Sequence, residues 1–244
     1  YFLLVENKES KRKSIQFFNV HGEALHKVFL TNNSNIEAYE ELKSSFVFDV
    51  LENIQVEANT SEKTPKGRSE LTTEEELEFK TAWNNLTDTH QFFGMLRRFD
   101  IQRTAALNYA PENMAVAVDN KVVETMLNTA SEKDMDIMVF IGNSGMIQIH
   151  TGKAKKIMWH GPWINVLDPD FNMHLKLEDI SNAWVVTKPT EDGEVNALEC
   201  FNDEGEMIVQ FFGKRKPGIP ELEEWKNLCS SLKSKHALKQ ATEV

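Results

Sequence analysis

A single histidine, His90, lies in a stretch of sequence that could present it as a metal ligand. Thr87 or Asp88 can cap the start of a helix, which then ends before Asp100. In the first turn the helix dipole disfavours protonation, so the imidazole stays in the neutral form that coordinates metals. The stripe expected to bury this helix consists of Phe92, Phe93, Leu96 and Phe99.

Gly94 follows His90 by one helical turn and leaves that face of the helix without a side chain. A flat ligand such as a haem needs this room against the backbone. The same residues also fit a capped amphipathic helix that carries a solvent-exposed histidine and a helix-breaking glycine. Evidence from the rest of the sequence is therefore needed to tell whether His90 is a ligand.

Three basic residues are placed beside apolar surface by the strand and helix patterns. Arg103 follows the His90 helix, Lys188 lies at the end of a predicted strand, and Arg215 follows the apolar run at 211–212. Haem carries two propionates that need cationic partners. Ordinary solvated charge is the alternative for each of these residues taken singly.

Composition excludes several classes of function. A formal net charge of -11 over 244 residues argues against nucleic acid and anionic membrane as general partners. The two cysteines, Cys200 and Cys229, have no paired spacing, so a disulfide framework, a zinc site and a covalent haem attachment are not indicated. A reducing cytoplasm fits best, and no apolar run is long enough to span a membrane. Nucleotide-binding loops, a hydrolase elbow and histidine pairs at metal-ligand spacing are also missing.

The periodicity predicts an α+β protein. Helices are expected at 35–51, over a helical run from 72 that Pro111 closes, at 121–132 and at 220–232. Strands are expected at 2–6, 14–20, 24–30, 114–118, 136–141, 146–150, 155–159, 163–167, 171–177, 183–188, 195–201 and 206–212. The polar, aperiodic segment 57–71 reads as a linker between domains at 1–56 and 72–236, with a tail at 237–244.

An internal repeat relates the two domains. Residues 15–25 align with 198–208, and the offset between Phe18 and Phe201 is 201 minus 18, or 183. The match continues into the helices that follow and, less closely, backwards from Leu3 against Val185. Applied to the second repeat, the offset puts the start of the first about 110 residues before Tyr1. We therefore expect an incomplete first repeat, and either a co-purifying N-terminal fragment or self-association through its exposed edge.

Several segments together resemble the HemS/ChuS/PhuS/HmuS family of cytoplasmic haem-handling proteins from bacterial haem-uptake systems. The resemblance covers nearly the whole chain. The segments that carry it are 87–93 (TDTHQFF), 141–152 (IGNSGMIQIHTG), 161–169 (GPWINVLDP), 185–190 (VVTKPT) and 212–218 (FGKRKPG).

The resemblance implies two structural repeats, each a large antiparallel sheet flanked by helices, with haem b (iron protoporphyrin IX) in a cleft of the second repeat. His90 matches the axial iron ligand of the family. In the family an arginine of the first repeat reaches the other haem face, and the segment that would carry it is not in this sequence. The positions expected to supply propionate partners and ring contacts are Arg103, Phe140, Lys188, Gln210 and Arg215.

These observations predict a protein that accepts imported haem from an importer and carries it to a storage or degradation partner, such as a downstream acceptor or oxygenase. No catalytic residue is assigned. Two alternatives stay open: a haem-degrading enzyme that opens the porphyrin and releases iron with external electrons, and a non-enzymatic partner-binding module. Carrier and enzyme both need one axial histidine, so the sequence does not separate them.

Overall fold

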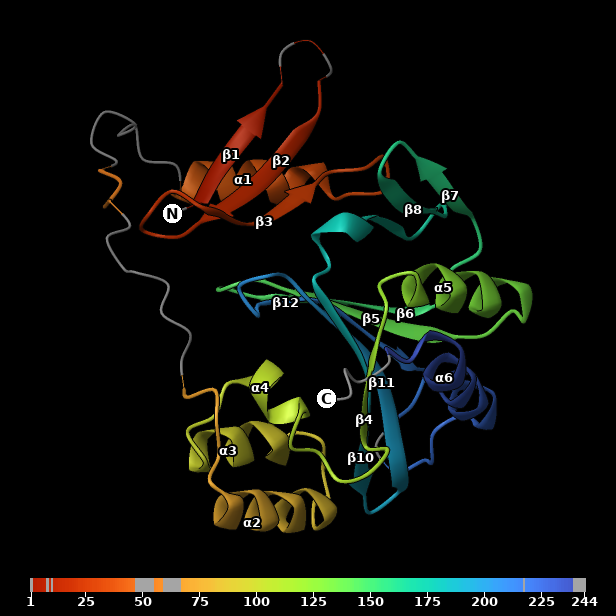
Figure 1. Cartoon of the computed structure of the whole chain (residues 1–244). Coiled ribbons are helices and arrows are strands. Elements are labelled where there is room, and N and C mark those ends of the chain that lie inside the picture. The colour runs from red at the N-terminus through yellow and green to blue at the C-terminus, as the bar shows by residue number, and fades with distance from the viewer. Residues whose placement is uncertain are drawn as a thin grey trace. The chain divides into compact units, whose positions relative to one another are not determined.

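The computed structural model describes residues 2–7, 9, 11–46, 55–58, 67–216 and 218–238 (Figure 1). The chain divides into two compact units, Tyr1–Lys63 with Asn143–Ile147, and Thr64–Gly142 with Gln148–Val244. Antiparallel sheets and helices form both units, which confirms the α+β prediction. The finer boundaries expected from the sequence, at 57–71 and 237, stay predictions.

The first unit contains one three-stranded antiparallel sheet and one helix. The strands β1 (Phe2–Glu6), β2 (Lys13–Phe18) and β3 (Ala24–Phe29) pair in the order β1-β2-β3, and α1 (Ile36–Phe46) follows. Gly22 takes a φ of +77° in the turn between β2 and β3, a conformation that glycine adopts readily. The remainder of the helix expected at 35–51 lies outside the described residues.

The register of the second unit repeats that of the first. In the second unit β10 (Asn182–Thr190), β11 (Gly193–Phe201) and β12 (Met207–Gly213) form the matching hairpins. The pairing of Ser14 with Phe29 corresponds, 183 residues later, to that of Ala197 with Phe212, and both hairpins are irregular at the same place, before Phe18 and before Phe201. The match of β1 is shifted, because the loop after β1 is longer than the turn between β10 and β11.

A six-stranded sheet organises the second unit. Its strand order is β4-β10-β11-β12-β5-β6, and the additional strands are β4 (Ala115–Val118), β5 (Ile137–Gly142) and β6 (Ile147–Gly152). The pairs β4–β10, β10–β11, β11–β12 and β12–β5 are antiparallel. The two longest strands, β10 and β11, are neighbours within this sheet, and β11 is buried from Val195 to Phe201.

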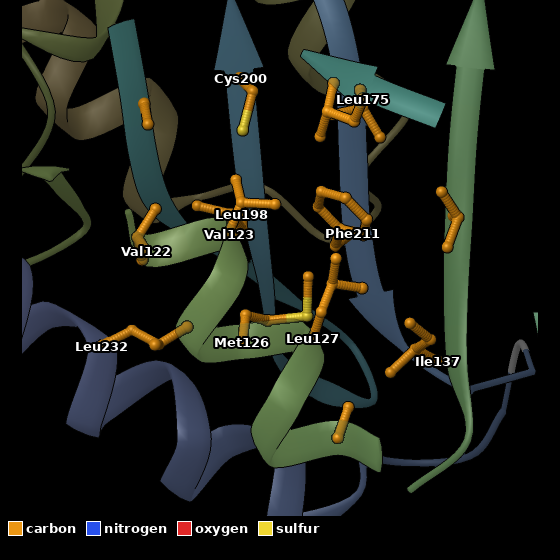
Figure 2. Close-up of a cluster of buried hydrophobic side chains, with 14 of the residues drawn as sticks. Val122, Val123, Met126, Leu127, Ile137, Leu175, Leu198, Cys200, Phe211 and Leu232 are labelled. Carbon is orange, nitrogen blue, oxygen red and sulfur yellow. The ribbon is translucent and has the colours of Figure 1, made fainter. Parts of the chain in front are cut away.

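Two helices cover one face of this sheet and complete the larger core. Figure 2 shows Val123, Met126 and Leu127 of α5 (Val122–Glu132) against Leu198 and Phe211 of the sheet. Leu232 of α6 (Glu223–His236) belongs to the same cluster. Because side chains alternate along a strand, the residues next to Leu198 and Phe211, which include Glu199 and Gln210, point toward the other face of the sheet.

Three short helices cover part of that other face: α2 (Thr73–Asn84), α3 (Gln91–Arg98) and α4 (Arg103–Leu107) (Figure 1). A capping box begins α2, since Thr72 accepts from the Glu75 backbone N–H and the Glu75 side chain accepts from the Thr72 N–H. The helix expected from 72 ends at Asn84, and the His90 helix is separate and ends at Arg98, before Asp100 as predicted. Asp100, with a φ of +48°, breaks the run between α3 and α4.

The remaining strands form a separate sheet. β7 (Ile157–His160), β8 (Trp163–Leu167) and β9 (Asn172–Lys176) pair antiparallel in that order, and a 3-10 turn (Leu177–Asp179) leads from them to β10. The sequence predicted each strand but not that they leave the main sheet. α6 begins three residues later than expected and runs four residues further, to His236.

Candidate functional site

His90 stands at the entrance of α3 with its side chain 91% exposed. The helix begins at Gln91, so His90 occupies the N-cap and not the first turn, which corrects the prediction. Asp88 keeps His90 outside the first helical turn, because Asp88 Oδ1 accepts a hydrogen bond from the His90 backbone N–H at 2.7 Å and closes a local turn before the helix. The same oxygen lies 2.6 Å from His90 Nδ1.

The carboxylate of Asp88 orients the imidazole. Hydrogen bonds from His90, first from its backbone and then from its ring, hold the pKa of Asp88 below its ordinary value. A carboxylate at this distance accepts a hydrogen bond from Nδ1–H, so in the neutral imidazole the lone pair lies on Nε2. This is the arrangement in which a carboxylate fixes the tautomer of a metal-binding histidine.

The buried face of α3 ties His90 to the sheet. Phe92 is fully buried and meets the ring of Trp83 edge to face, with centroids 4.8 Å apart. Trp83 Nε1 in turn donates to the carbonyl of Thr187 in β10 at 3.1 Å. Phe93, expected in the buried stripe, is 60% exposed, and Met95 occupies the buried position instead. The helix is therefore held by its inner face while its outer face stays free.

The outer face of α3 carries a cleft. A Cβ built on Gly94 would meet nothing within 4 Å, so the room expected there is present. A cleft of about 430 Å³ has Phe93, Arg97 and Arg103 in its lining, which includes neither His90 nor Gly94. Its size falls in the range of small-molecule pockets.

Three of the predicted site residues converge on a carboxylate that the sequence reasoning missed. Glu199 accepts from Arg103 through both of its oxygens, at 2.7 and 2.9 Å, and Oε1 also accepts from Lys188 Nζ at 2.8 Å and from Gln210 Nε2 at 3.2 Å. The side chain of Glu199 is 0% exposed, that of Lys188 is 6% and that of Arg103 is 15%. Lys188 is thus an interior residue of β10, and its expected place at a strand end is corrected.

Two cations face one anion in this buried group. Burial alone would raise the pKa of Glu199, but Arg103 and Lys188 overcome it and lower the pKa to about 2. For Lys188 burial is the largest effect and lowers the pKa, Glu199 opposes it, and Arg103 adds to it. Phe92 supports both cations, since its ring centroid lies 4.5 Å from Lys188 Nζ and 5.1 Å from the Arg103 guanidinium carbon. With all three groups ionised the cluster keeps one surplus positive charge.

Arg215 and Phe140 complete the set. Arg215 forms an ion pair with Asp192 at 3.6 Å, and its charge makes a small contribution to the lowered pKa of Asp88, the carboxylate that holds His90. Phe140 lies opposite Gln210 in the β5–β12 pairing, and its ring packs edge to face on Phe212 with centroids 5.1 Å apart. All six predicted residues thus belong to the second unit.

A signal for Glu199 exists in the sequence. It is the only charged residue of the run 195–201, and a charge inside a buried strand requires a partner. Among the described residues, no group of three or more His, Cys, Asp or Glu side chains could hold a metal ion. None of the helices in those ranges has the length and apolar character that a bilayer crossing requires.

Comparisons with known proteins identify the family to which the chain belongs. The family model described as "Haemin-degrading HemS.ChuX domain" matches residues 1–46 and 100–232, which includes five of the six site residues and leaves His90 between the two segments. The hemin transport protein HemS of Yersinia enterocolitica is 35% identical over 235 residues, covering 96% of this chain and 67% of that protein.

The comparison with solved structures leads to the same group of haem proteins. Apo-PhuS, described as a heme-binding protein from Pseudomonas aeruginosa, is 38% identical with a TM-score of 0.87, covering 97% of this chain and 68% of that one. ChuS, described as a heme degrading enzyme of Escherichia coli O157:H7, is 35% identical with a TM-score of 0.83, covering 95% and 66%. The chain belongs to the HemS family and spans about two thirds of the length of these relatives.

Proposed function

We propose that this chain binds haem b through Nε2 of His90 and carries it within bacterial haem utilisation. The observation that supports this most directly is the exposed imidazole, whose Nδ1 is held by Asp88 so that Nε2 is left to coordinate. The names of the relatives, a hemin transport protein and a heme-binding protein, point to the same ligand.

The residues present fit such a ligand. His90 supplies a neutral nitrogen for the iron, and the open space at Gly94 accommodates a flat ring. The surplus charge of the Arg103, Lys188 and Glu199 cluster suits propionates, to which Gln210 and Arg215 add donors, and Phe140 offers a ring contact. Haem itself supplies the iron and the conjugated ring, and the chain supplies binding and orientation.

As a carrier, the protein would receive haem from an importer and release it to a downstream acceptor or oxygenase in the cytoplasm. The free thiols Cys200 and Cys229 are both buried, which agrees with a reducing compartment. An exposed ligand at a helix end suits transfer, because a partner can reach it without opening the core.

Degradation of haem is a second candidate, favoured by the description of ChuS as a heme degrading enzyme. The two functions separate when the haem complex is incubated with a reductant, with and without dioxygen, in the presence of catalase. Decay of the Soret band with release of iron under these conditions would support the enzyme. A stable complex that passes haem to an apo-acceptor would support the carrier.

The ligand assignment has a direct test. His90→Ala should weaken haem binding strongly and shift the Soret band, while His160→Ala, at an exposed strand end, serves as control. Asp88→Asn should weaken binding about 10- to 100-fold, as loss of such an orienting carboxylate does elsewhere. A His90→Ala spectrum identical to that of the wild type would remove His90 as the ligand.

A further inference from the structure

Glu199 holds an unusual place in the proposed site, because it is an anion among the groups meant to bind another anion. It accepts four hydrogen bonds, and every donor is a residue proposed to face the propionates: Arg103, Lys188 and Gln210. Its carboxylate is fully enclosed, so it does not itself meet a ligand in the cleft. Its action must pass through these donors.

The fold does not need a carboxylate at this position. The hairpin of β2 and β3 repeats that of β11 and β12 residue for residue, including the irregularity, and carries Gln16 where the second unit has Glu199. Gln16 donates to Ser14 at 3.1 Å and the hairpin forms. Lys27 stands opposite Gln16, where Gln210 stands opposite Glu199. The acidic centre is therefore a feature of the second unit and not of the repeated sheet.

We infer that Glu199 is a positioning residue that fixes the Arg103 guanidinium and keeps Lys188 charged, so that the pocket selects ligands with carboxylates. This inference rests on the proposed haem function, in which Glu199 would organise the cationic groups that bind the propionates. Arg103 is held by both of its hydrogen bonds in one orientation, and its remaining N–H groups are left for a ligand.

The charge of Lys188 depends on Glu199. The groups that face Lys188 are Glu199 from β11, the Arg103 guanidinium from α4 and the ring of Phe92 from α3. Glu199 alone among them is an anion. Without it, a buried ammonium would face only another cation and an aromatic ring, which would lower the pKa of Lys188 further and favour loss of its proton. The pocket would then lose a charge as well as a fixed guanidinium.

The test uses Glu199→Gln, which keeps the shape of the side chain and removes its charge. Affinities are measured for haem and for haem dimethyl ester, whose propionates are esterified, in the same detergent. We expect the variant to bind haem about 10- to 100-fold more weakly and the ester as the wild type does. The Soret spectrum of the haem complex should stay unchanged, because His90 is untouched.

A pH series adds a readout that a merely structural role would not move. The haem affinity of Glu199→Gln should recover as the pH falls and Lys188 regains its proton, while the wild type shows no such recovery. Glu199→Asp keeps the charge but is one methylene shorter, so it should lose affinity for haem and keep the wild-type pH profile. It also serves as the test if Glu199→Gln does not fold.

An equal loss for haem and ester, or no loss for either, would overturn the inference. Failure of the proposed function is distinguishable, since the wild type would then bind neither compound or His90→Ala would leave the spectrum unchanged.

Discussion

Lys188→Met should leave the empty protein as stable as the wild type or make it more stable, even though it removes a hydrogen-bonded buried charge. Lys188 is 5% exposed and is the second cation at a single carboxylate. Methionine has a similar shape and no charge to desolvate. After the change, Arg103 and Glu199 stay as a balanced pair joined by two hydrogen bonds.

The magnitude follows from two opposing terms. Loss of the bond from Lys188 to Glu199 costs about 1.5–3 kcal/mol. Removing the buried ammonium recovers a desolvation penalty of several kcal/mol, so the net change should lie between zero and a gain of about 2 kcal/mol. Glu199→Gln should instead destabilise by about 3 kcal/mol, because it leaves two buried cations without an anion. Proton release from Lys188 keeps that loss from being larger.

Urea unfolding followed by tryptophan fluorescence measures these changes in the right part of the protein. All tryptophans lie in the second unit, at positions 83, 159, 163, 184 and 225. Lys80→Met is the matched control, since the side chain of Lys80 is 40% exposed and pairs with Glu76 one helical turn before it. It should change the unfolding free energy by less than about 0.5 kcal/mol.

The same variant should bind haem more weakly than the wild type, because it removes the surplus charge. Lys188 would then be a residue that costs stability and serves binding. If Lys188→Met is destabilised as much as Glu199→Gln, Lys188 serves the fold, and the reasoning from surplus charge is refuted.

Three further outcomes are expected. Gly94→Ala should stabilise the second unit by about 0.5–1 kcal/mol in urea unfolding, because its Cβ meets open space within a helix. Gly94→Leu should fold but bind haem more weakly, as measured by haem titration. Gly213→Ala should destabilise by about 1–3 kcal/mol in the same urea assay, since its Cβ would lie 2.5 Å from Trp225 Cγ. Acid should remove the contribution of Glu199 to stability, because folding lowers its pKa from 4.5 to about 2. This stability is present above pH 4.5 and is lost as the pH falls to about 2. Glu199→Gln should lack this part of the pH dependence of the unfolding free energy.

The local elements of this protein follow from the sequence alone. An apolar run flanked by Pro162 and Asp168 predicted β8 at Trp163–Leu167 with the bounds that the structure has. The helical run expected from 72 begins at a capping box of Thr72 and Glu75, and the repeat offset predicted the matching registers of β2–β3 and β11–β12. These signals are readable because turns, caps and alternation involve residues close together in the chain.

The tertiary structure decided which charges meet. Arg103 and Glu199 are 96 residues apart, and Lys188 and Glu199 share a face only because β10 and β11 pair in one register. Burial of Lys188 depends on Phe92 of α3, whose ring lies under the ammonium, and on Trp83 of α2, which donates to the carbonyl of the neighbouring Thr187. A lysine between apolar residues looks the same in sequence whether it is solvated or paired, since its state depends on what the fold packs over it.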